Sequence, residues 1–229
     1  MPRFTPRAET YSAERAYVTV NGVNLASTYG MLLTGYSVGV PEPLLKYIDV
    51  PGRPGKLDAT LALNGKVNYD TRPVTAEFHV RDCDYPAFQT LLSTLLPLLN
   101  GTESRMEFST DPGWYYKGRF SVNVKKSNPA TAVIALNCEN AFPYKLENTP
   151  YTVQQSISGS GDVVCVGKDY NGPVTVTVSA AMTLTVGDDE YLLTSGENLL
   201  RELHPVSGNN TLQFTGTGTV AISYERGIL

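Results

Sequence analysis

Apolar and polar residues alternate along much of the chain with the two-residue period of strands that bury one face. In the run 74–81, Val74, Ala76, Phe78 and Val80 fall on one face, and polar residues fall on the other. Two Asn-Gly pairs, at 21–22 and 64–65, lie between such runs. They predict tight hairpins, because both central residues of a type I′ turn need positive φ. The first 150 residues are therefore predicted to be largely antiparallel β.

One segment, 84–101, departs from this period, because its apolar residues recur at the three- and four-residue spacing of a helix face. Asp84 suits an N-cap, Pro86 suits the first turn and Asn100-Gly101 suits the end. Pro97 should kink or end the last turn. We expect the apolar stripe to pack on a sheet; a surface for a partner helix is the alternative. The stripe consists of Phe88, Leu91, Leu92, Leu95, Leu96 and Leu99.

The composition changes after residue 150. The stretch 156–161 (SISGSG) has the composition of a flexible linker, and short β runs follow it, separated by turn residues. Residues 1–150 carry 15 Lys+Arg and 14 Asp+Glu, whereas 151–229 carry 3 and 8. These changes predict two domains, 1–150 and 151–229, the second being a small β-sandwich in which TGTGT (215–219) is a hairpin turn.

No catalytic constellation stands out. The chain has two histidines, His79 and His204, and neither lies in a recognisable catalytic motif. The three cysteines, Cys83, Cys138 and Cys165, are far apart and favour neither a disulfide framework nor a zinc site. We expect no enzyme activity and no cofactor or metal. Paired acids of the glycosidase type remain an open alternative, since their spacing is spatial.

Charge and hydropathy exclude two further classes. No apolar run approaches the ~20 residues of a membrane span, and the N-terminus has no apolar segment of a signal peptide. The net charge of −4 gives no general footprint for nucleic acid. We therefore expect a protein made in the cytoplasm and not secreted.

Two segments have the composition of contact surfaces. The stretch 50–58 (VPGRPGKLD) combines two prolines, two glycines and three charges, which predicts a stiff, exposed corner. The stretch 111–119 (DPGWYYKGR) places Trp114, Tyr115 and Tyr116 in a row after a turn, so at least one ring should leave the sheet. Exposed aromatics often mark interfaces; a ring covered within the subunit is the alternative.

The order of these segments resembles the distal tail proteins of long-tailed siphophages. The resemblance runs from the first Asn-Gly hairpin through VPGRPGKLD, PVTAEFHVRD, the Leu-rich helix, DPGWYYKGR and CENAFPY to a final Gly/Thr-rich β module. It implies a mainly β fold, with a tail-tube-like β-sandwich or barrel domain that carries one helix, followed by a galectin-like β-sandwich.

The resemblance also implies a function in the virion, at the tail tip, after assembly in the cytoplasm of a host bacterium. Such proteins form a homo-hexameric ring, a hub between the tail tube protein and the tail-associated or fibre protein. In many phages they also hold receptor-binding proteins, and DNA passes through the ring without specific binding. No membrane is involved.

The resemblance implies that residues of these two stretches are subunit-interface candidates. A simple turn within one subunit is the alternative for the corner. The acidic run Asp188-Asp189-Glu190, which lacks the spacing of a calcium loop, is a candidate for docking a peripheral partner. The interface candidates are Pro51, Gly52, Arg53, Pro54, Gly55, Lys56, Trp114, Tyr115 and Tyr116.

A second function class is open: a carbohydrate-binding adhesin component that recognises host cell-wall glycans through 151–229. Galectins stack a sugar on tryptophan, and Trp114, the only tryptophan, lies in the other predicted domain. A fold does not carry function with it. A cell-wall hydrolase is a third class, which the sequence does not support with a motif.

Overall fold

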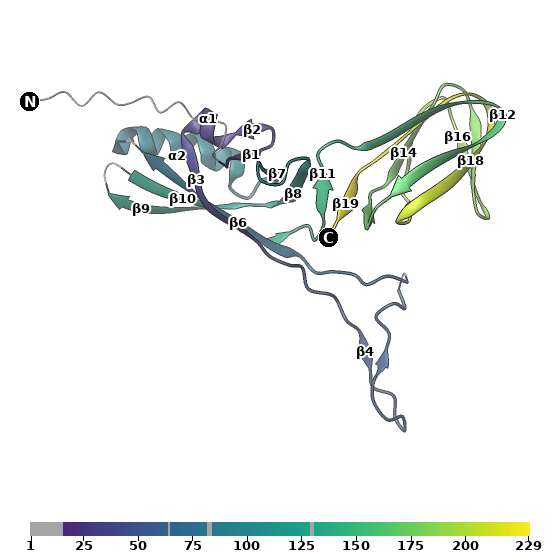
Figure 1. Ribbon diagram of the computed structural model, residues 1–229, viewed down its shortest axis with the longest axis horizontal. Coiled ribbons are helices and arrows are strands. Elements are labelled where there is room, and N and C mark those ends of the chain that lie inside the picture. The colour runs from purple at the N-terminus through teal and green to yellow at the C-terminus, as the bar shows by residue number, and fades with distance from the viewer. Residues whose placement is uncertain (1–15, 64, 82–83, 129–130) are drawn as a thin grey trace, which may run out of the picture.

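The computed structural model describes residues 16–63, 65–81, 84–128 and 131–229. The chain is mainly β, as predicted, and consists of two β bodies side by side with an arm that projects from the first (Figure 1). Besides the predicted helix there is a second one, α1 (Leu25–Tyr29), which at five residues is too short to show an apolar period. The Asn24 side chain caps it by accepting from the backbone N–H groups of Ala26 and Ser27.

The first body contains a four-stranded antiparallel sheet with the order β3-β6-β10-β9. Its face is set by the predicted alternation: Val74, Ala76, Phe78 and Val80 are all buried. The strands are β3 (Met31–Val38), β6 (Arg72–Arg81), β10 (Thr131–Ala141) and β9 (Ser121–Asn128).

The predicted helix is α2 (Tyr85–Leu99), capped by Asp84, whose side chain accepts from the backbone N–H of Ala87 at 2.9 Å. Pro97 does not end the helix, which continues for two more residues. The apolar stripe packs in the core as expected, except that Leu96 is exposed.

A second sheet crosses from the first body to the second, in the order β13-β19-β11-β8-β7-β1-β2. Two of its strands come from beyond residue 150, so the end of the chain completes a sheet that the first half begins. The strands are β13 (Tyr170–Asn171), β19 (Arg226–Ile228), β11 (Lys145–Glu147), β8 (Trp114–Arg119), β7 (Glu103–Phe108), β1 (Val18–Val20) and β2 (Val23–Asn24).

The two Asn-Gly pairs have different outcomes. The first forms the predicted hairpin between β1 and β2, with Asn21 at φ 50° and Gly22 at φ 82°. The second prediction is wrong as far as it can be followed: residues 60–63 form turns, and no strand flanks Gly65 in the described chain. The nearest strand pairs away from this turn, and Asn64 lies outside the described residues.

The second body is a six-stranded sheet that curls around its own apolar cluster. The long strands β12 (Tyr151–Gly167) and β18 (Gly208–Tyr224) pair along their whole length and form a curved ribbon (Figure 1). On its other edge β18 pairs first with β15 and then with β14. The remaining strands are β14 (Val174–Val178), β15 (Met182–Val186), β16 (Asp189–Leu193) and β17 (Gly196–Leu200).

The ribbon corrects two predictions. The Ser/Gly stretch 156–161 is no linker, because it lies within β12, and TGTGT is no hairpin turn, because it lies within β18. Small polar residues are typical of loops when only the local sequence is considered. Here each stretch pairs with a strand about 60 residues away, and this pairing satisfies its backbone hydrogen-bonding groups. The likeness of this body to galectins and the division at residue 150 stay predictions. The described residues include no helix that could cross a membrane.

Candidate interaction surfaces

An arm, residues 39–71, leaves the first body between β3 and β6 (Figure 1). Near its far end β4 (Tyr47–Ile48) and β5 (Leu57–Asp58) pair antiparallel, and the predicted corner 50–56 joins them. Gly52 and Gly55 have φ of 80° and 77°, a conformation that other residues rarely adopt. The corner is therefore the tip of a projecting hairpin.

The arm is held in shape by its own backbone. Along its length Leu44 donates to Asn68 and Asp70 donates to Glu42, both through backbone groups at 2.8 Å. Further out, Ala59 donates to Lys46 at 2.8 Å. These bonds tie the two sides of the arm together, so it is a braced projection and not a free loop.

The arm exposes an unusual amount of apolar surface. Tyr47 and Ile48 are neighbours on one strand, so they point to opposite faces, and they are 53% and 42% exposed. Both faces are therefore bare, which monomeric proteins avoid. The exposed apolar side chains of the arm are Val40, Leu44, Leu45, Tyr47, Ile48, Val50, Leu57, Leu61 and Leu63.

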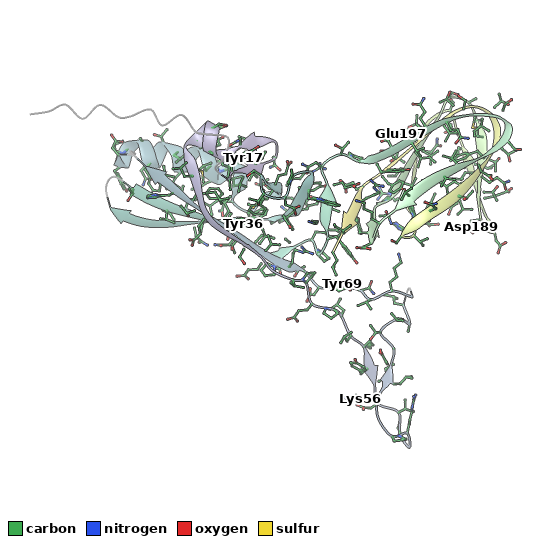
Figure 2. The ribbon with its side chains drawn as sticks, in the orientation of Figure 1. Tyr17, Tyr36, Lys56, Tyr69, Asp189 and Glu197 are labelled. Carbon is green, nitrogen blue, oxygen red and sulfur yellow. The ribbon has the colours of Figure 1, made fainter. Side chains whose placement is uncertain are left out.

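The charges at the tip are open to solvent. Lys56 lies 3.7 Å from Asp49, with both side chains mostly exposed. Arg53 has no ion pair with any described residue, and only its backbone N–H donates, to Val50 O at 3.1 Å. Figure 2 places Lys56 toward the far end of the arm and Tyr69 at its base. The tip can therefore offer two cations to another molecule.

The aromatic candidates on β8 are placed differently from the prediction. Tyr115 and Tyr116 are buried, so a neighbouring subunit cannot reach their rings, and they are corrected here to core residues. The Tyr115 hydroxyl donates to Glu225 at 3.0 Å, and the Tyr116 ring lies 5.7 Å from the Arg72 guanidinium. Burial, followed by the charge of Glu225, raises the pKa of Tyr115 far above its ordinary value. The alternative, rings covered within the subunit, holds for both tyrosines.

Trp114 is half-buried at the junction of the two bodies, with the ammonium groups of Lys168 and Lys145 at 4.5 Å and 5.1 Å from its ring. Next to it, Glu147 accepts from Lys168 at 2.7 Å and from Arg226 at 2.7 Å and 3.0 Å. Burial alone would raise the pKa of Glu147, but the hydrogen bonds from Arg226 and Lys168 outweigh it and lower that pKa. Sequence reasoning missed this cluster, because its members are distant in the chain; Glu147 and Arg226, for example, lie 79 positions apart.

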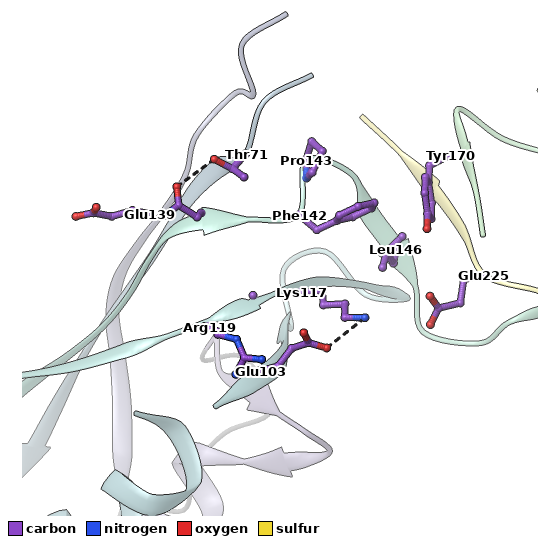
Figure 3. A pocket seen from close by; sticks show the side chains of 12 residues that line it. Thr71, Glu103, Lys117, Arg119, Glu139, Phe142, Pro143, Leu146, Tyr170 and Glu225 are labelled. Atoms are coloured by element: carbon purple, nitrogen blue, oxygen red, sulfur yellow. Dashed lines mark hydrogen bonds and ion pairs between the residues drawn. The ribbon is translucent and has the colours of Figure 1, made fainter. Parts of the chain in front are cut away.

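A cavity of about 560 Å³ opens at the same junction (Figure 3). Phe142 and Tyr170 lie on one side of it, and the Glu103–Lys117 ion pair, at 3.3 Å, lies across from them. No histidine or cysteine is among the twelve residues that line it. His79 is half-buried on β6, His204 is exposed, and Cys138 and Cys165 are buried free thiols; Cys83 lies outside the described residues. The titratable acids that line the cavity are Glu103, Glu139 and Glu225.

The acidic run lies at the β15–β16 hairpin: Asp188 is in the turn, and Asp189 and Glu190 begin β16 (Figure 2). All three are exposed, as predicted for a solvated turn. The described residues contain no group of His, Cys, Asp or Glu that could hold a metal ion. Among the described residues, no hydrogen bond or ion pair joins these acids to the arm or to the junction cluster.

No protein-family model and no curated protein matches the sequence. Among solved structures, the chain is similar to the crystal structure of SPP1 Dit (gp 19.1), described as a paradigm of the hub adsorption apparatus in phages that infect Gram-positive bacteria. The sequences are 15% identical, and the superposition covers 93% of this chain and 99% of Dit with a TM-score of 0.63. The chain has the Dit fold. A Dit fold over nearly the full length confirms the mainly β architecture that the resemblance implied.

Proposed function

We propose that the chain is a structural protein of a phage tail tip that forms a homo-hexameric ring and serves as a hub of the adsorption apparatus. The arm carries this proposal. A braced projection with two bare apolar faces and two open cations is suited to a receiving surface, and no part of the chain that the structure describes covers it. In a closed ring each copy offers one surface to a complementary surface of the next. The fold shared with Dit supports this role.

The ring would lie at the distal end of the tail in the virion, after assembly in the cytoplasm of the host bacterium. It would join the tail tube protein to a tail-associated or fibre protein and hold receptor-binding proteins. We assign ring formation to 1–150, which contains the arm, and peripheral docking to 151–229, which contains the acidic run. DNA would pass through without specific binding; duplex binding that weakens steeply with salt would contradict this.

The test of the ring is the mass of the native particle. The protomer is 24.9 kDa, so native mass spectrometry of the purified protein should show a six-fold multiple of that mass. A strict monomer at tens of micromolar, with no rings in electron micrographs, would contradict the proposal.

A second candidate function is a carbohydrate-binding adhesin component. The observation that favours it is the junction cavity, which Phe142 and Tyr170 line together with the carboxylates of Glu103 and Glu225. Binding of the purified protein to host cell-wall polysaccharide, lost on Tyr170→Ala, would support it. Ring formation without any wall binding favours the hub.

A further inference from the structure

The outer edge of β12 lacks a neighbouring strand. β12 is 17 residues long and pairs throughout with β18, and no other strand of the described chain pairs with it. Its even-numbered residues from Gln154 to Val166 are exposed. A free edge presents unpaired backbone N–H and C=O groups, which can template another strand.

This edge is also poorly protected. Proteins usually blunt an edge with charges, proline or a short strand. β16 and β17 have five residues each and carry such charges, Asp189 and Glu190 on β16 and Glu197 on β17. β12 has no proline and a single charge, Asp162, and it exposes Val164 and Val166 by 47% and 38%. An apolar pair beside an open edge is a surface that a partner strand would cover.

Two features define how much of the edge is open. Gly159, at φ 79°, interrupts the extended conformation, so a single added strand would lie on one side of it. The Val166 carbonyl already accepts from the Tyr224 hydroxyl at 3.0 Å and from Arg226 at 3.1 Å. The open segment beside the apolar pair is therefore 160–165.

Charge distinguishes the two possible occupants of this edge, a second copy of β12 and a basic strand of a partner protein. Residues 151–229 carry 3 Lys+Arg against 8 Asp+Glu, a balance of −5. By register, Asp162 lies in one row with Gln213, Thr185 and Glu190 on the outer face. Pairing two copies through β12 would bring like charges together, whereas a basic strand would be attracted.

We propose that 160–165 accepts, as an added strand, an extended segment of a partner protein in which apolar and basic residues alternate. This rests on the docking role proposed for 151–229. Backbone hydrogen bonds would supply affinity, and the partner's apolar side chains would cover Val164. The chemistry is strand addition, so it needs no pocket in the sandwich.

The test uses two synthetic peptides on the full-length protein, one alternating Val and Lys and a matched one alternating Val and Glu. The Lys peptide should slow amide hydrogen exchange in 160–165 by about tenfold, and the Glu peptide should not. The effect should weaken with salt. Val164→Lys should abolish the protection, whereas Leu199→Lys, at a similarly exposed position on β17, should leave it intact.

Equal binding of both peptides, protection at β16 instead of β12, or dimerisation through β12 without peptide would each overturn the inference. These results are separable from the hub itself. A hexamer that ignores the Lys peptide would leave the hub standing and remove the edge site. Protection of 160–165 by the Lys peptide in a protein that forms no ring would support the edge site and contradict the hub.

Discussion

Arg53 and Lys56 lie at the tip of the arm, where no described side chain neutralises Arg53 and only an exposed contact to Asp49 reaches Lys56. Exposed charges contribute little to the stability of their own subunit but much to recognition between molecules. The role in assembly that we propose for them can therefore be separated from folding by substitution.

Arg53→Glu together with Lys56→Glu should convert the ring to smaller species while thermal unfolding of the subunit stays within about 0.5 kcal/mol of the wild type. Light scattering after gel filtration gives the first quantity and circular dichroism the second. Asp188→Lys with Asp189→Lys, a double reversal away from the arm, is the control and should keep the ring. An intact hexamer in the Arg53/Lys56 variant would make the corner a simple turn.

Glu147 accepts from two cations in a half-buried position, so its loss leaves Lys168 and Arg226 facing each other. Glu147→Gln should lower the free energy of unfolding at pH 7 by about 1–3 kcal/mol. Asp188→Asn, an exposed acid without such contacts, is the matched control and should be neutral. A neutral Glu147→Gln would mean that the cluster does not hold the two bodies together.

The same residue predicts a pH dependence. The pKa of Glu147 is lower in the folded chain than its ordinary value of about 4.5, so the ionised form stabilises the fold. This stabilisation is fully present above the ordinary pKa and disappears as pH falls through the lower, folded pKa. Urea unfolding from pH 7 to pH 3 should show a smaller loss of stability for Glu147→Gln than for the wild type. Parallel pH curves would contradict this.

At the scale of elements, the sequence predicts those whose signal is local. The period of two identifies the buried face of β6, and capping residues with a leucine stripe identify α2. It fails where pairing is distant: the Gly/Ser/Thr stretches within β12 and β18 look like loops until each is paired with the other. The five-residue α1 is too short for periodicity, and its cap at Asn24 is the signal that could have found it.

The glycines of β18 suggest an element-scale test. Gly216, at φ 142°, lies where an added Cβ would be 2.8 Å from Met182 Cγ, at the point where β18 passes from β15 to β14. Gly216→Ala should destabilise the second body by about 1–3 kcal/mol, through strain and crowding. Gly35→Ala is the matched control, because a Cβ there meets nothing within 4 Å. Equal melting curves for the two variants would show that the ribbon tolerates a side chain at its bend.

At the scale of the whole molecule, the candidate surfaces were only partly predictable. The composition of 50–58 predicts an exposed corner, and the structure confirms its exposure but adds a 33-residue arm behind it that no local pattern indicates. The prediction that Tyr115 and Tyr116 on β8 form a contact surface was wrong, because β8 lies between β7 and β11 in the interior of its sheet. Burial of this kind depends on which strands become neighbours.

The shared sheet predicts how the chain responds to division at residue 150. The fragment 1–150 keeps the arm but loses β19, which pairs with β11 and packs Gly227 against Leu146. Its free energy of unfolding should fall by at least about 2 kcal/mol relative to the first body in the full chain. The fragment 151–229 retains β12 and β18 whole and should fold as a monomer.

Circular dichroism and light scattering on the two fragments, with the full chain as control, measure these outcomes. Fragment 1–150 as stable as the full chain would show that β19 is dispensable. Oligomers formed by 151–229 alone would reverse the assignment of ring formation.

The pairing of β19 with β11 also constrains the order in which the protein is made. A ribosome releases β11 roughly 80 residues before β19. During translation the edge of β11 that pairs with β19 therefore stays open while the second body is synthesised. The second body is completed at almost the same time as β19, because its central strand β18 ends at Tyr224, two positions before β19 begins. A nascent chain halted before β19 keeps this edge unsealed. Closure of the sheet thus reports that synthesis of the second body is finished.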